Sequence, residues 1–185
     1  MSNPWRTLQG RIVYENNWIR VRVDDVIRPD RSPGIYSVVE LKGGIGVVAL
    51  DQRDRVLLVG QFRYTVNKYS WEIPKGAFPS FNYEGDPIET AREELAEETG
   101  ATSNDWTYLG RVHTLLGSTN DEVYLFRARG LKPGEPHPDE TEVLQTKWVE
   151  EGEFWEMVAA GEITDATSIA ALALSRRTAA GRKAE

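Results

Sequence analysis

The chain has 185 residues, of which 40% are hydrophobic and 28% are charged, a composition typical of a folded domain rather than a disordered chain. It contains no cysteine, which excludes disulfides, thiolate metal sites and cysteine nucleophiles, and no apolar run of the roughly 18 residues that a membrane span needs. The net charge of −7 argues against a nucleic-acid-binding surface, and the N-terminus lacks the apolar stretch of a signal peptide, so we expect a cytoplasmic protein.

The first third of the chain is predicted to be β structure. β-branched residues are frequent from residue 11 to residue 50, and Ile19, Val21 and Val23 alternate with charged residues at the period of a half-buried strand. Further strands are predicted at residues 35–39, 45–50 and 56–59. The last two are joined by a short turn, and we expect them to pair as a hairpin.

The strongest helical pattern runs from Pro87 to Thr99. Asp86 is a favoured N-cap residue, proline suits the first helical position, and Glu89 has the spacing of a capping box. Gly100 stands where a left-handed residue ends a helix. The sequence therefore predicts one well-bounded helix between strand-forming segments.

The second half of the chain adds strands and ends in helices. Strands are predicted at residues 106–112, 123–128 and 147–149, and helices at residues 154–160 and 168–177. A loop rich in proline, glycine and acidic residues is predicted at residues 132–141. This order indicates an α+β fold with a β-rich subdomain over residues 1–44, a main domain over residues 45–178 and a frayed tail at residues 179–185.

The predicted helix carries an unusual concentration of acidic residues. Glu94 and Glu98 are four apart and share one face, and Glu97 lies on the flank of that face. Like charges at this spacing destabilise a helix by roughly 0.2–0.5 kcal/mol per pair. A solvated acidic surface is the commoner outcome on spacing alone. The alternative is a site for Mg²⁺, which prefers oxygen ligands and shares its coordination shell with substrate phosphates.

The sequence around this helix resembles that of the Nudix family, whose signature reads G-x5-E-x7-R-E-U-x-E-E-x-G-U, where U is aliphatic. Four residues match its second half, namely Glu94, Glu97, Glu98 and Gly100. Trp71–Gly76 looks like the strand and turn before the signature, and Gln61–Tyr64 is similar to the arginine-bearing strand of ADP-ribose pyrophosphatases. Residues 118–126 fit the same subfamily, so the resemblance covers roughly residues 14–174.

Three departures from the signature lie in its first half. Glu93 occupies the position of the signature arginine, with Arg92 one place earlier. The first signature glutamate falls on Gly85, with Glu84 beside it. The segment at residues 77–83 is about three residues longer than the pattern allows.

The resemblance implies a Nudix fold, with a mixed β-sheet in an α/β/α sandwich, and a metal-dependent hydrolase. By this likeness Glu94 and Glu98 are the main metal ligands, supported by Glu97, with Mg²⁺ the expected ion and Mn²⁺ the alternative. A glutamate from the acidic loop acts as general base, first Glu142 and then Glu140, and Glu97 is the next candidate. On this interpretation the reaction releases a nucleoside monophosphate and a sugar phosphate from ADP-ribose or a similar nucleotide sugar.

The resemblance also implies substrate-binding residues and a partner chain. Arg63 is expected to grip phosphate with its forked guanidinium, although a strand arginine paired with a neighbouring acid fits the pattern equally well. Glu122 is expected to contact the sugar or to order the loop that carries it. The N-terminal region, which contains Trp5 and Trp18, helps to form a homodimer and the adenine pocket in similar enzymes.

Two alternatives stay open. Leu115–Gly117 stands where ADP-ribose pyrophosphatases typically carry a proline, so GDP-mannose or another sugar nucleotide is an alternative substrate. Glu93 and Gly85 motivate a second hypothesis, in which a degenerate Nudix domain binds nucleotides without cleaving them.

Overall fold

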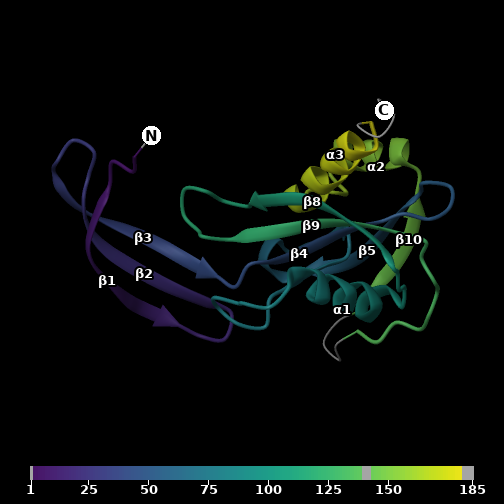
Figure 1. Ribbon diagram of the computed structural model, residues 1–185, viewed down its shortest axis with the longest axis horizontal. Coiled ribbons are helices and arrows are strands. Elements are labelled where there is room, and N and C mark those ends of the chain that lie inside the picture. Colours follow the sequence, from purple (N-terminus) through teal and green to yellow (C-terminus); the bar gives the residue numbers. More distant parts are fainter. Residues whose placement is uncertain (1, 139–142, 181–185) are drawn as a thin grey trace.

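The computed structural model describes residues 2–138 and 143–180, with side chains to Arg176. At one end of the molecule β1 (Arg6–Glu15), β2 (Ile19–Ile27) and β3 (Pro33–Leu41) form an antiparallel sheet in that order. This N-terminal sheet projects from the rest of the protein (Figure 1). It is attached through β3, where Val39 N donates to Ser118 O at 2.9 Å.

Two further sheets form the main body. One has the order β7 (Lys75–Ala77), β4 (Gly44–Ala49), β9 (Glu122–Arg129), β8 (Asp105–His113). The other has the order β10 (Gln145–Val149), β5 (Val56–Arg63), β6 (Lys68–Glu72). β4 runs parallel to β9, and the other pairs within these two sheets are antiparallel, so the strand arrangement is mixed as predicted.

The predicted hairpin between residues 45–50 and 56–59 is wrong. β4 and β5 lie in different sheets and are joined only by an isolated bridge between Leu50 and Val56. Each is an inner strand whose two edges are already paired, and every residue of β4 is buried. A short turn favours pairing locally, but β4 pairs with β7 and β9 from later in the chain, and β5 pairs with the next strand, β6, and with β10 near the C-terminal helices.

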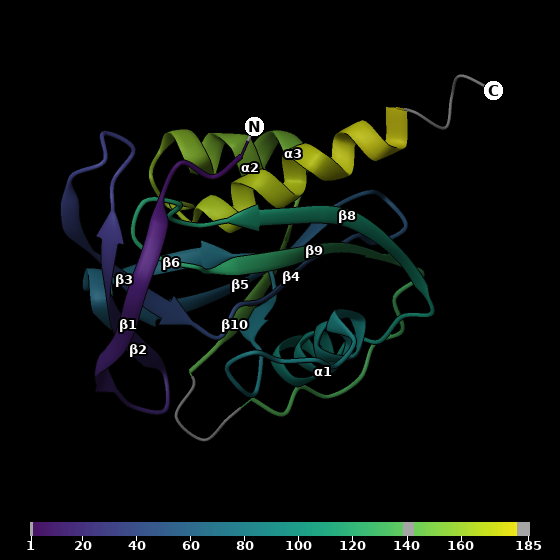
Figure 2. The same cartoon turned by 60° about the vertical axis from the view of Figure 1, so that its left-hand side comes forward.

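Helices cover both faces of the main body (Figure 2). α1 (Pro87–Thr99) lies on one side, and α2 (Glu151–Ala159) and α3 (Ala166–Ala180) lie on the other. Successive residues of β4 point to opposite faces of the sheet and pack in two different hydrophobic clusters. Val47 packs in the cluster that contains Leu95 of α1, whereas Val48 packs in the cluster that contains Phe154 of α2. The predicted α+β class and the predicted layering, with helices on both sides of the strands, are confirmed.

The predicted helix at residues 87–99 is confirmed at both ends. The Asp86 carboxylate accepts a hydrogen bond from Ile88 N at 3.1 Å, and Gly100 has a φ of 71° while its N–H donates to Ala96 O. The Glu89 carboxylate accepts from Arg92 at 2.9 Å rather than completing the expected capping box.

Several elements differ in extent from the prediction. β1 begins at Arg6, before the predicted β region, and β6 overlaps the strand expected at Trp71. β7 is an additional strand, and a 3₁₀ turn at Tyr64–Val66 follows β5. The last helix continues to Ala180, and the final residues of the predicted tail lie outside the described part of the chain. Within residues 2–138 and 143–180, no helix has the length and apolar character required to cross a bilayer.

Candidate functional site

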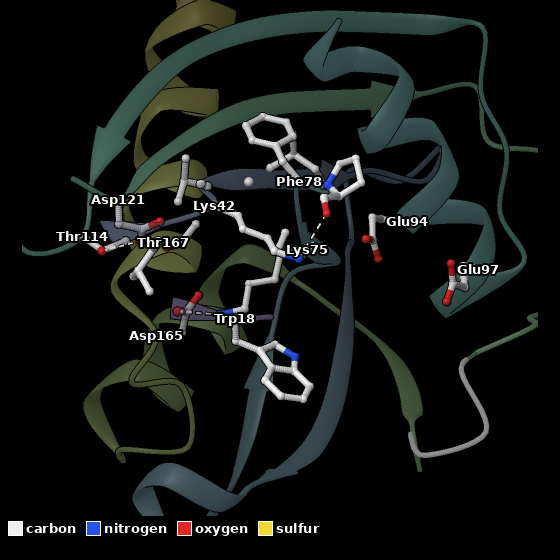
Figure 3. Close-up of a pocket in the computed structure, with 18 of the residues that line it drawn as sticks. Trp18, Lys42, Lys75, Phe78, Glu94, Glu97, Thr114, Asp121, Asp165 and Thr167 are labelled. Carbon is white, nitrogen blue, oxygen red and sulfur yellow. Dashed lines mark hydrogen bonds and ion pairs between the residues drawn. The ribbon is translucent and has the colours of Figure 1, made fainter. Parts of the chain in front are cut away.

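A pocket of about 850 Å³, the main pocket, opens beside the N-terminal sheet, the start of β4 and helix α1 (Figure 3). Its wall combines acidic and basic side chains, namely Glu94, Glu97, Asp121 and Asp165 with Lys42, Arg63 and Lys75. Trp18, from the turn between β1 and β2, also lines it. A concave site with converging charged groups is where a polar ligand is expected to bind.

The two principal predicted metal ligands meet the same turn. Glu94 projects from α1 onto Gly76, so closely that a Cβ at this glycine would overlap the Glu94 carboxylate. Glu98 is 5% exposed, and its Oε2 accepts a hydrogen bond from Lys75 N at 3.2 Å. The sequence-predicted carboxylates are therefore brought together at Lys75 and Gly76, the first two residues of β7.

A charged network lies beneath this turn. The Arg63 guanidinium forks onto Glu72, with Nε to Oε1 at 3.0 Å and Nη2 to Oε2 at 2.6 Å. Lys75 Nζ lies 2.9 Å from Glu72 Oε2 and 2.8 Å from Asp165 Oδ1. Asp165 also accepts from the N–H and hydroxyl of Ser168, which ties the start of α3 to the turn.

The network changes the acidity of Glu72. Burial alone would raise the pKa of this carboxyl, but hydrogen bonds from Arg63 and the charge of Lys75 lower the pKa from 4.5 to about 2. Because the folded-state pKa is lowered, the ionised group stabilises the fold above pH 4.5, and this contribution is lost as the pH falls towards 2.

This pH dependence gives a prediction for stability. We expect Glu72→Gln to lower the free energy of unfolding at pH 7 by on the order of 3 kcal/mol, because the neutral amide loses the interactions that lower the carboxyl pKa. The difference from the natural protein should shrink as the pH falls from 4.5 towards 2, where the glutamate itself becomes protonated. Urea unfolding of the metal-free proteins at several pH values measures this difference in the free energy of unfolding. A difference that stays constant with pH would contradict the pKa assignment, and exposed Glu93→Gln serves as the control.

The other predicted residues occupy several places. Arg63 lines the main pocket and is paired with Glu72, as one of its two interpretations expects, and its contact with phosphate stays a prediction. Glu97 lines the pocket, and its carbonyl accepts from His137 N at 2.8 Å. Glu122 lies outside the main pocket, in a smaller neighbouring one, where Arg111 is 2.9 Å away. Glu140 and Glu142 lie outside the described residues.

Sequence reasoning missed the side chains of Glu72, Lys75 and Asp165. Asp165 had a local signal, since an aspartate three residues before a serine at the start of a helix is a typical N-cap arrangement. The ion pair between Lys75 and Asp165 joins residues 90 positions apart, and no local pattern predicts it.

The residues present fit a magnesium or manganese ion in part. Both principal donors are carboxylates, which suits hard divalent cations. Within the described residues, no group of three acidic or histidine side chains converges closely enough to enclose a metal. Mg²⁺ commonly uses one or two carboxylates and completes its shell with water and substrate phosphate, so a pair such as Glu94 and Glu98 is a suitable anchor.

The contact between Gly76 and Glu94 gives a second prediction. We expect Gly76→Ala to reduce catalytic activity at least about tenfold, because the added methyl displaces the Glu94 carboxylate. The fold should persist, since the change lies on the pocket wall. Activity assays and thermal unfolding measure the two effects. Gly152→Ala is the matched control, because nothing lies within 4 Å of a Cβ there; equal activity in the two variants would contradict the placement of Glu94.

Comparison with known proteins gives family matches over most of the chain. A family model described as NUDIX domain matches residues 40–172, and one described as nucleoside diphosphate sugar hydrolase N-terminal domain matches residues 5–39. The chain is 28% identical over 172 residues to an ADP-ribose pyrophosphatase of Mycobacterium tuberculosis, covering 91% of this chain and 82% of that protein.

Two further similarities extend this picture. The chain is 26% identical over 171 residues to a CMP-5'-(N-acetyl-N-hydroxy-3-aminopropyl)phosphonate hydrolase of Streptomyces rubellomurinus, covering 92% of this chain and 82% of that protein. Its fold is similar to the crystal structure of an ADP compounds hydrolase, with a TM-score of 0.82 at 20% identity, covering 96% of this chain and 95% of the other.

Proposed function

The chain belongs to the Nudix family of hydrolases, and on that premise we propose that it cleaves the diphosphate of ADP-ribose or a similar nucleotide sugar. The products are a nucleoside monophosphate and a sugar phosphate. The observation that carries this proposal is the placement of Glu94 and Glu98 against the Lys75–Gly76 turn, beside a pocket of about 850 Å³. The name of the mycobacterial relative and the N-terminal family match support the choice of substrate class.

Nudix hydrolases generally need a divalent metal, and we propose that Glu94 and Glu98 hold Mg²⁺, or Mn²⁺ in its place, with support from Glu97. A bound ion of this kind polarises the diphosphate and lowers the pKa of an attacking water. The protein's part is to hold the carboxylates in place. The Lys75 N–H orients Glu98, and the absence of a side chain at Gly76 lets Glu94 approach the turn.

The general base is proposed to be Glu142, with Glu140 second and Glu97 next. Support comes from the described residues that precede these acids. His137 N donates to Glu97 O at the end of α1, so the chain leaves the described region beside the helix that carries the proposed metal ligands. A base must reach the attacking water to accept its proton, and His137 is the described residue that ties this part of the chain to the helix of the proposed metal ligands.

Substrate contacts are proposed for Arg63 and Trp18. The bonds to Glu72 use Nε and Nη2 of Arg63, so Nη1 is the nitrogen that can turn to a phosphate oxygen. Trp18 lines the main pocket and is 71% exposed as a residue, which suits its ring to stack on a nucleobase. Glu122 remains proposed for the sugar, from the neighbouring pocket.

A substrate panel tests the function. Purified protein is incubated with ADP-ribose, GDP-mannose and other nucleotide sugars in Mg²⁺, in Mn²⁺ and in EDTA. We expect AMP and ribose 5-phosphate from ADP-ribose only when metal is present. The panel must be broad, since the Streptomyces relative is named for a CMP-linked phosphonate. Product from no substrate would contradict hydrolysis and favour the binding-only hypothesis that Glu93 and Gly85 motivate.

A homodimer is proposed for the N-terminal sheet. Every residue of β1 is exposed, and large apolar side chains stand on the sheet, including Leu8 at 55%, Ile12 at 46% and Ile35 at 61% exposure. Apolar surface of this kind favours burial against a second copy. Light scattering should give twice the chain mass of 20.9 kDa, and Ile12→Asp should shift the mass towards a monomer. A monomer of the natural chain at micromolar concentration would refute the dimer.

A further inference from the structure

A second, smaller pocket of about 170 Å³, the side pocket, adjoins the main pocket. The two share Leu41, Lys42, Gly43 and Phe78 in their walls. Drug-sized ligands occupy pockets of roughly 300–1,000 Å³, so a volume of this size suits a single ring. A ligand that fills the main pocket can therefore extend one ring into the side pocket.

The side pocket is built by the segment at residues 77–83, which is longer than the Nudix signature allows. Phe78 is buried and stacks on Tyr83 with ring centroids 4.7 Å apart, and it also contacts Tyr124 of β9. Phe81 lies under the Arg20 guanidinium at 4.2 Å, which fastens the segment to the N-terminal sheet. The extra residues therefore form a fixed wall in this chain.

Lys42 stands at the junction of the two pockets. Arg63 and Lys75 are both paired with carboxylates, whereas the Lys42 ammonium donates to the Pro79 carbonyl at 3.1 Å. Among the described cations of the main pocket, Lys42 is thus the one whose observed partner is uncharged. Figure 3 places Lys42 and Lys75 between the rings of Trp18 and Phe78. A lysine in this position can hold a phosphate as a point charge.

The chemistry of the side pocket favours a neutral ring rich in hydroxyls. Glu40 and Glu122 contribute carboxylates, which are paired with Arg22 and Arg111 and have further lone pairs that can accept hydrogen bonds from a ligand. Asn82 contributes an amide, and Asn120 uses its Oδ1 to accept from Leu41 N, which leaves its amide nitrogen as a donor. A sugar hydroxyl both donates and accepts, whereas adenine offers one donating amino group and mainly ring-nitrogen acceptors.

We propose that the side pocket is the subsite for the sugar of the sugar-phosphate half of the substrate, with Lys42 holding the phosphate attached to it. This inference rests on the proposed function. It assigns the nucleoside half to the Trp18 end of the main pocket. It also assigns a role to the extra residues at 77–83: they select the sugar. The reaction itself depends on other residues, Glu94 and Glu98.

The test measures binding of the two product halves separately. Ligand-observed NMR titrations of metal-free protein use ribose 5-phosphate as the sugar-phosphate probe and AMP as the nucleotide probe. Lys42→Met is expected to weaken ribose 5-phosphate binding by at least about tenfold, since it removes a charge-assisted contact. Asn82→Gly removes the amide but keeps a backbone with a φ of 56°, and a loss of about threefold or more is expected. Binding of AMP should change less than about twofold in both.

Matched controls separate this effect from a general disturbance. Lys68→Met removes a lysine outside both pockets, and Asn67→Gly changes another asparagine of positive φ, 51°. Both controls should bind ribose 5-phosphate like the natural chain. Equal weakening of AMP and ribose 5-phosphate, no weakening of either, or no ribose 5-phosphate binding by the natural chain would overturn the subsite. Selective loss in a protein that cleaves no nucleotide sugar would support the subsite and contradict the proposed function alone.

Discussion

Glu94→Gln and Glu98→Gln are each expected to lower turnover of a nucleotide sugar by several orders of magnitude. A metal ion contributes several kcal/mol of transition-state stabilisation, and each ~1.36 kcal/mol corresponds to a factor of ten in rate. The amide keeps the size of the side chain but loses the negative charge that binds a cation. Steady-state kinetics in saturating Mg²⁺ measure the loss, and isothermal titration calorimetry with Mg²⁺ measures the weakened binding of metal.

The structure supplies a control and a distinction between the two variants. Glu93 is an exposed glutamate on the same helix, so Glu93→Gln should keep turnover within about twofold. Glu98 is buried and accepts from Lys75 N, and a glutamine oxygen can accept the same bond, so the fold should survive. Near-normal Mg²⁺-dependent turnover in both active-site variants would contradict the metal assignment.

Glu142→Gln is expected to lower kcat by about 10²–10⁴-fold, the usual contribution of a general base. KM should change much less, because a base acts in the transition state and contributes little to ground-state binding. Steady-state kinetics on the best substrate of the panel, in saturating metal, separate the two constants.

The neighbouring acid provides the comparison. Glu140→Gln should slow turnover less than Glu142→Gln, and the reverse order would move the base to Glu140 within the same segment. If neither variant slows turnover tenfold, the base lies elsewhere, and Glu97 on the pocket wall becomes the candidate.

Local sequence signals predicted helix α1 well, but they did not predict which distant strands pair with each other. Asp86 and Gly100 mark the ends of α1 because caps depend on bonds within a few residues. The hairpin prediction failed because β4 pairs with the remote strands β7 and β9, while β5 pairs with β6, which follows it, and with the remote strand β10. The acidic face was visible from spacing, but only the resemblance to a family distinguished a metal site from a solvated surface.

The rest of the site required three-dimensional proximity. Glu72 and Arg63 belong to adjacent strands, yet Asp165 joins them from the opposite end of the chain. The side pocket likewise unites residues of β3, the signature loop and β9. Comparison with the spacing of the Nudix signature could show that the segment at residues 77–83 is longer than usual. It could not show which strands this segment would contact.

The ion pair between Lys75 and Asp165 bears on the effect of a mutation that removes the C-terminal helix α3. Asp165 holds the start of α3 and, through Lys75, the turn against which the two proposed metal ligands rest. A premature stop codon shortly before it would remove no proposed catalytic residue, yet it would remove one of the two carboxylates that pair with Lys75, together with the buried residues Ala171 and Leu172 of α3. Natural selection therefore has a reason to preserve the final helix for the sake of a site that lies almost a hundred residues upstream.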